Sequence, residues 1–183
     1  MSPSPLRRSR TVQTALSVLL LMAGVALLAP PSAWGQGTVV YLVRHAEKEA
    51  EPAADPPLTA EGQARARALA HALADAGLTA IWSSDYARTR DTAVPVAEGT
   101  GLDVQLYDPR DLPGFASALR AQAGRFLVVG HSNTTPALVA MLGGEPGQPI
   151  DEPSEYDRLY VLVINGGVTT TTLLRFGEPS PGR

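Results

Sequence analysis

The chain has 183 residues, of which 44% are hydrophobic and 18% charged, so it is long and apolar enough to fold as one domain rather than remain disordered. It contains no cysteine, which excludes disulfide bonds, thiolate catalysis, iron–sulfur clusters and cysteine-ligated zinc. Its three histidines exclude any site that needs many imidazoles.

Residues 1–35 have the pattern of a secretory signal peptide. Three arginines precede an uninterrupted apolar run of 15 residues, and the small residues Ala33 and Gly35 stand at the expected cleavage site. The run is shorter than the roughly 20 residues that span a bilayer. We expect export to the periplasm or out of the cell, a mature domain at 36–183 and no stable membrane association. An uncleaved N-terminal membrane anchor is the alternative.

Removal of this segment would leave an acidic domain. The segment carries three arginines and no acidic residue, so its loss changes the net charge from −3 to −6. A domain with this net negative charge lacks the basic character of proteins that bind nucleic acid or anionic lipid. We therefore expect a small-molecule partner, and an anionic one would require a local cluster of arginines.

Short apolar, β-branched runs alternate with segments of helical periodicity through a core at 38–176. The predicted strands are 38–43, 80–83, 104–106, 125–129, 158–164 and 168–175. The predicted helices are 59–76, one that begins near 87, 113–123 and 133–142. A hairpin signal, Asn165-Gly166-Gly167, joins the last two strands. The alternation predicts a three-layer α/β/α sandwich with a mostly parallel central sheet and an antiparallel C-terminal edge strand.

Two histidines and two arginines follow the predicted parallel strands. Arg44 and His45 follow the first strand, Arg88 comes shortly after the second, and His131 follows the strand at 125–129. Ligands of such sheets bind beyond the carboxyl ends of the strands, so these side chains should converge. Because guanidinium groups match phosphate oxygens, the pattern predicts a phosphate pocket.

Taken alone, each of these residues has an ordinary structural explanation. Only the occurrence of all four after the predicted parallel strands indicates a functional site. A metal site built from the two histidines and Glu47 is the chemical alternative. Arginines beside the histidines would repel a cation, so we expect no metal and no cofactor. The third histidine, His71, lies in an alanine-rich helical segment and receives no role.

Four motifs, in this order along the chain, resemble the histidine phosphatase superfamily in its phosphoglycerate-mutase-like branch. The motifs are Val43-Arg44-His45-Ala46-Glu47-Lys48, Leu58-Thr59-x-x-Gly62, Ser83-Ser84-x-x-x-Arg88-Thr89-x-x-Thr92-Ala93 and Val129-Gly130-His131-Ser132-Asn133-Thr134. The resemblance implies an α/β sandwich and a phosphohistidine intermediate. It also implies that His45 is the nucleophile and that Arg44, Arg88 and His131 complete the phosphate pocket.

These expectations describe a metal-independent phosphomonoester hydrolase. Neutral imidazole attacks phosphorus well, provided that a backbone carbonyl holds the far nitrogen of His45 in its protonated form. Protonated His131 and the arginines would bind the phosphoryl oxygens. Two alternatives remain: a non-catalytic phosphate- or phosphoprotein-binding module on the same fold, and a phosphoglycerate-mutase-type phosphotransferase. The short loops favour hydrolysis over the mutase reaction.

The sequence motifs do not single out the residue that donates a proton to the leaving oxygen. The acid-phosphatase branch of the family has an aspartate directly after the second histidine, where this chain has Ser132. The mutase branch takes a glutamate from the region after the second arginine, which here offers Asp108 and Asp111. Asp108 is the preferred candidate. Glu47 is an alternative, although orienting its neighbours in the phosphate pocket is the role we expect for it.

Overall fold

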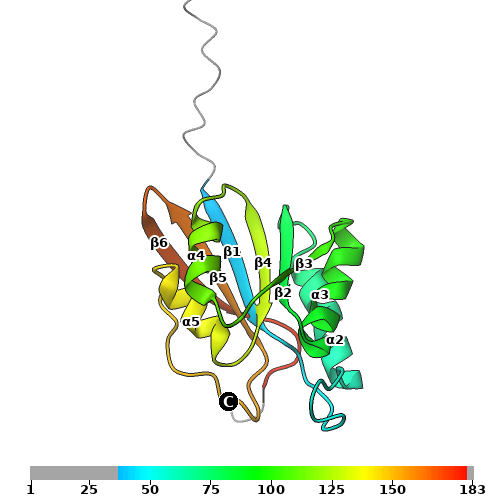
Figure 1. The fold of residues 1–183 in the computed structure, drawn as a ribbon. Helices are drawn as coiled ribbons and strands as arrows, with labels where there is room; N and C mark the ends of the chain where they lie inside the picture. The colour runs from blue at the N-terminus through cyan, green and yellow to red at the C-terminus, as the bar shows by residue number, and fades with distance from the viewer. Residues whose placement is uncertain (1–36, 181–183) are drawn as a thin grey trace, which may run out of the picture. The chain divides into compact units, whose positions relative to one another are not determined.

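A mixed six-stranded sheet with helices on both faces forms the domain in this computed structural model, which describes residues 37–180 (Figure 1). The strands are β1 (Thr38–Arg44), β2 (Ala80–Ser84), β3 (Val104–Tyr107), β4 (Arg125–Gly130), β5 (Arg158–Asn165) and β6 (Val168–Arg175). Their order is β3-β2-β4-β1-β5-β6. The first four strands run parallel, β5 is antiparallel to β1, and β6 is antiparallel to β5. The predicted fold class is confirmed, whereas the predicted signal peptide lies outside the described residues.

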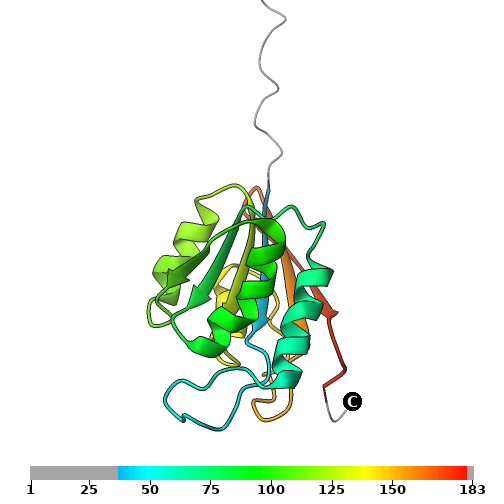
Figure 2. The ribbon, with the colours of Figure 1, turned by 90° about the vertical axis from the view of Figure 1, so that its right-hand side faces the viewer.

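Two pairs of helices form the outer layers. Helices α2 (Ala60–Ala72) and α3 (Ala87–Thr100) lie side by side on one face, as Figure 2 shows, and α4 (Leu112–Arg120) and α5 (Thr134–Met141) lie on the other. None of the helices within residues 37–180 combines the length and the hydropathy that a membrane span requires.

The central strand β1 is apolar along its length because both of its faces are covered. Successive side chains of a strand point to opposite faces of the sheet. Leu42 accordingly belongs to the cluster that includes Leu138 of α5, and its neighbour Val43 belongs to the cluster that includes Leu69 of α2. This double burial is what the run at 38–43 predicted.

Helix α2 ends four residues earlier than predicted. Thr59 caps its start as expected, since the Thr59 side chain accepts a hydrogen bond from the Gly62 amide at 3.0 Å. The helix stops at Ala72, and the chain continues through turns to Gly77, whose φ of 64° is left-handed. The glycine therefore ends the turns rather than the helix itself.

The direction of the strands decides which loops can meet. The carboxyl ends of β1, β2, β3 and β4 lie at one end of the sheet, the lower end in Figure 1. Because β5 runs the opposite way, its first residue, Arg158, lies at this same end. The segment before β5 therefore meets the loops that follow the parallel strands.

Candidate active site

His45 lies just beyond the end of β1 and is 3% exposed. Its amide donates to the carbonyl oxygen of Gly130 at 2.9 Å, which continues the pairing of β1 with β4. The ring Nδ1 lies 2.7 Å from the carbonyl oxygen of Ala46. A carbonyl can only accept, so Nδ1 carries the proton and Nε2 keeps a free lone pair.

Helices α2 and α3 fix the loop after His45. The Ala46 amide donates to Thr92 Oγ1 on α3 at 3.0 Å. On the other side, the carboxylate of Glu47 forms an ion pair with Arg65 of α2, with 2.7 Å between Arg65 Nη2 and Glu47 Oε1. Gly62 permits this approach, because a Cβ there would lie 2.1 Å from the Glu47 carbonyl oxygen. The ring of His45 is thus held by a loop attached to two helices.

His131 follows β4 and meets His45 edge to face, with 5.5 Å between the ring centroids. Its Nε2 lies 2.9 Å from Ser84 Oγ, and Ser84 Oγ donates in turn to Thr89 Oγ1. The Thr89 hydroxyl donates to a backbone carbonyl, so the Ser84 proton points to Thr89 and His131 Nε2 must donate to Ser84. The nitrogen of His131 that can gain a proton is therefore Nδ1.

Arg88 lies in the first turn of α3 and packs its guanidinium over Tyr86, 4.4 Å from the ring centroid. Its Nη1 lies 3.7 Å from the Asp55 carboxylate, and its buried Nε has no hydrogen-bond partner in the structure. A buried guanidinium N–H without a partner is costly, which is a reason to expect an anion there.

Arg44 is 1% exposed and is turned toward the segment before β5. Its Nη1 donates to the carbonyl oxygen of Glu155 at 2.9 Å, and its Nη2 lies 3.2 Å from Glu152 Oε1. The guanidinium also stacks on Tyr156, 4.0 Å from the centroid of the ring. Only its Nε has no partner. Arg44 therefore borders the site and positions this segment, but it does not line the cavity described next.

A cavity of about 350 Å³ brings His45, His131 and Arg88 together. The other residues that line it are Lys48, Tyr86, Pro109, Ser132, Asn133, Thr134 and Glu152. Within residues 37–180, no group of three or more histidine and acidic side chains is placed to hold a metal ion. The charges at the cavity suit an oxyanion better than a cation.

Both histidines of the cavity are uncharged at neutral pH. Burial lowers the pKa of His45 to about 3 despite the hydrogen bond to the Ala46 carbonyl, and the charges of Arg44 and Arg88 add to the lowering. Burial, followed by the charges of Arg88 and Arg44, lowers the pKa of His131 to about 4. The expected protonation of His131 therefore depends on an anion in the cavity.

The three carboxylates considered as candidates from the sequence have other partners. Asp108 lies in the loop after β3, where Arg110 donates to it at 2.9 and 3.0 Å and lowers its pKa. It lines a neighbouring cavity of about 450 Å³ rather than the one with the histidines. Asp111 accepts from the Gly114 amide and caps α4. Glu47 is bound to Arg65, which supports its expected orienting role.

Sequence analysis missed the acidic residue that does line the cavity, Glu152. It also missed Tyr156, which stacks on Arg44 and lies 6.2 Å from the His45 ring. Both residues precede the strand β5, whereas the site residues predicted from the sequence all follow strands. Recognising β5 as an antiparallel neighbour of β1 would have directed attention to them.

Fold and cavity together define the class of protein: an α/β sandwich with a two-histidine oxyanion pocket at the carboxyl end of its parallel strands. Residues 40–109 match the sequence model of the histidine phosphatase superfamily (branch 1), a range that includes His45 and Arg88. This match confirms the resemblance to the histidine phosphatase superfamily that the sequence motifs indicated, and the fold agrees with it.

Solved structures share this fold. SixA from Agrobacterium tumefaciens, assigned as a phosphohistidine phosphatase, is 27% identical with a TM-score of 0.59, over 78% of this chain and 98% of that one. A protein histidine phosphatase SixA in complex with tungstate is 19% identical with a TM-score of 0.61, over 75% and 96% of the two chains. Phosphoglycerate mutase from Bacillus anthracis is 17% identical with a TM-score of 0.56, over 75% and 92%. No curated protein sequence matches the chain significantly.

Proposed function

We propose that the protein is a metal-independent phosphomonoester hydrolase that works through a phosphohistidine on His45. The observation that carries this proposal is the 2.7 Å hydrogen bond between His45 Nδ1 and the Ala46 carbonyl. It leaves Nε2 as a free nucleophile in the cavity that Arg88 and His131 also line.

In the first half-reaction, Nε2 of His45 attacks phosphorus in line with the leaving oxygen. The N–P bond forms as the P–O bond breaks, and the alcohol leaves with a proton from solvent or from the ester. The ring then carries positive charge, and the Ala46 carbonyl stabilises it by accepting from Nδ1. Arg88 binds the phosphoryl oxygens as negative charge spreads over them.

His131 responds to the charge of the substrate. The pKa of its ring is held near 4 by burial and by the arginine charges, so a dianionic phosphate would favour uptake of a proton. That proton would bind at Nδ1, since Nε2 already donates to Ser84. The site thus gains positive charge when the phosphate enters.

Leaving groups of low pKa should be the best substrates. Asp108 is bound to Arg110 and lines a different cavity, and Glu47 is bound to Arg65, so neither is free to protonate a leaving oxygen in this arrangement. Esters of acidic alcohols need little protonation. A phosphoramidate belongs in the substrate panel as well, because the SixA relatives carry the name phosphohistidine phosphatase.

The test uses protein that begins at Gln36, with aryl phosphates, alkyl phosphates and a phosphoramidate as substrates. We expect turnover that survives EDTA, inhibition by vanadate that is competitive with substrate, and alkali-stable, acid-labile phosphate on the enzyme. A chelator-sensitive activity that zinc or magnesium restores would contradict the proposal. Tight binding of phosphate without turnover would favour the non-catalytic module, and transfer between phosphoglycerates would favour the mutase.

We also propose that the protein is exported and acts in the periplasm or outside the cell. The support is the arrangement of three arginines, a 15-residue apolar run and small residues before Gln36. Cell fractionation followed by N-terminal sequencing tests this directly. A mature N-terminus near Gln36 is expected, and an intact Met1 in the membrane fraction would favour the anchor.

A further inference from the structure

We propose that Glu152 is the general base that activates water for hydrolysis of the phosphohistidine. This inference rests on the proposed function and assigns the second half-reaction to a residue of the segment before β5. Among the residues within 37–180 that line the cavity, Glu152 carries the one carboxylate. Both histidines, His45 and His131, line the same cavity.

Arg44 holds Glu152 at this cavity. The guanidinium Nη2 of Arg44 lies 3.2 Å from Glu152 Oε1. Nη1 of the same group donates to the carbonyl oxygens of Asp151 at 3.4 Å and Glu155 at 2.9 Å, on either side of Glu152 in the chain. Because Arg44 directly precedes His45, one side chain ties the backbone around Glu152 to the nucleophile's own strand.

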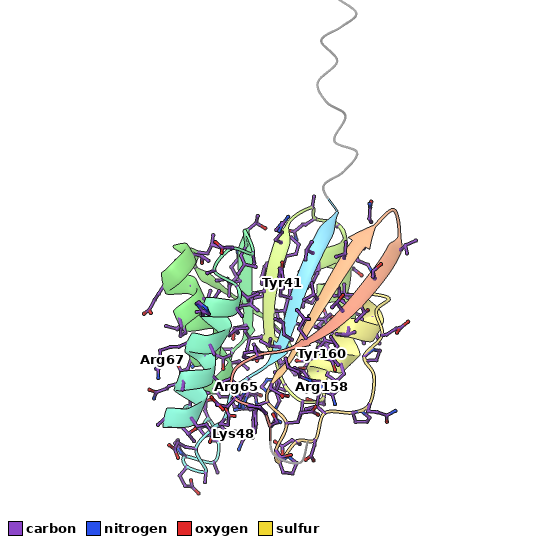
Figure 3. All side chains as sticks on the ribbon, turned by 180° about the vertical axis from the view of Figure 1, so that it is seen from behind. Tyr41, Lys48, Arg65, Arg67, Arg158 and Tyr160 are labelled. Atoms are coloured by element: carbon purple, nitrogen blue, oxygen red, sulfur yellow. The ribbon has the colours of Figure 1, made fainter. Side chains whose placement is uncertain are left out.

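A buried ionic cluster fixes the far side of the same segment. The Glu155 carboxylate, 8% exposed, accepts from Arg158 at 2.7 and 2.8 Å and from Arg175 at 2.8 Å. It also accepts from the amide of Asp151 at 3.1 Å. Figure 3 shows Arg158 at the start of β5, near the end of the sheet where Lys48 and Arg65 lie. A segment anchored in this way can hold a catalytic group without a strand or helix of its own.

The exposure of Glu152 suits proton transfer. Its side chain is 60% exposed, in contrast to that of Glu155, so it can accept a proton from water and pass it to solvent. The carboxylate that pairs with the Arg44 guanidinium can only accept protons, which makes it a base rather than an acid. Glu152 therefore fits the step that removes a proton from the attacking water better than the step that protonates the leaving alcohol.

The step balances without a further reactant. Water attacks phosphorus opposite His45, and the new P–O bond forms as the P–N bond breaks. The electron pair of that bond returns to Nε2, while Nδ1 keeps its proton on the Ala46 carbonyl, so neutral imidazole leaves. The proton of the water goes to the Glu152 carboxylate and from there to solvent, and inorganic phosphate is released.

The decisive measurement follows formation and decay of the phosphoenzyme separately. Wild type and Glu152→Gln are mixed with a radiolabelled aryl phosphate in a rapid-quench instrument, then chased with unlabelled substrate. Glutamine can still accept a hydrogen bond from Arg44 but is not a base. We expect label to form at about the wild-type rate and to decay ~10²-fold more slowly, since general bases contribute about 10²–10⁴-fold. The label should therefore accumulate on His45.

Two further variants keep the outcome unambiguous. Glu145→Gln changes an exposed glutamate of the same segment that does not line the cavity, and its decay should equal that of wild type. Asp108→Asn removes one of the two carboxylates that line the neighbouring cavity. Wild-type decay in Glu152→Gln, equal slowing of formation and decay, or accumulation in Asp108→Asn instead would each overturn the proposal. Absence of label on wild-type His45 would contradict the proposed function itself.

Discussion

The imidazole of His45 is oriented by the carbonyl of the next residue in the chain, Ala46, at 2.7 Å from Nδ1. The Ala46 peptide is held in turn on its amide side by Thr92 at 3.0 Å. The orientation of the His45 ring therefore depends on backbone that α3 holds in place, and not on a carboxylate that could change its protonation state.

Replacement of His45 by alanine should abolish both turnover and phosphate labelling, because the other histidine of the cavity, His131, uses its Nε2 to donate to Ser84. His71→Ala is the matched control, since His71 is exposed on α2 and lies outside the cavity. Steady-state assays and acid-labile labelling measure the effect. Labelling that persists in His45→Ala would remove His45 from the role of nucleophile.

Replacement of Arg88 by lysine should lower kcat/KM by about 10²–10³-fold, the loss typical for one donor to a charged transition state. Lysine keeps the positive charge but lacks the planar fork that includes the unpartnered Nε. Arg90→Lys on the same helix is the control, because Arg90 pairs with Asp55 and Asp85 at the surface. A loss of equal size in both variants would indicate damage to α3 rather than to phosphate binding.

Acid should destabilise the fold through His45. Its pKa in the folded protein is about 3, below the ordinary 6.5, so the unfolded chain binds more protons between these pH values. The stability that His45 contributes should therefore be fully present above about pH 6.5 and fall by ~1.4 kcal/mol per pH unit from there down to about pH 3. Urea titrations of wild type and His45→Asn measure this slope, which should be shallower in the variant.

Loss of Arg158 should destabilise the protein by about 3–5 kcal/mol, because it leaves the buried carboxylate of Glu155 with less compensation. Arg110→Met is the matched comparison: Arg110 is 89% exposed and pairs with an exposed carboxylate, so its loss should destabilise the protein far less. Urea denaturation with a shared m-value measures both. Similar losses in Arg158→Met and Arg110→Met would show that the cluster contributes little.

Residues that follow parallel strands were predictable from the sequence because the sheet itself brings them together. His45 and His131 meet for this reason, as β1 and β4 are neighbours in the ladder. The partners of the carboxylates were not predictable. Whether Asp108 turns toward the histidines or toward Arg110 depends on side-chain rotation, and the pairing of Glu47 with Arg65 depends on how closely α2 packs.

Because β5 runs antiparallel to β1, the residues of the candidate site are held in two different ways. His45 and His131 follow strands whose register is set by backbone hydrogen bonds. Glu152 belongs to the segment 145–157, which is tied to the sheet chiefly by the side chains of Arg44, Arg158 and Arg175. An insertion or deletion in this segment would leave His45 in place while it moved the proposed base. Under the proposed mechanism, such a change would alter how long the phosphohistidine survives, and would turn a rapid hydrolase into a slow-release phosphate carrier without altering either histidine.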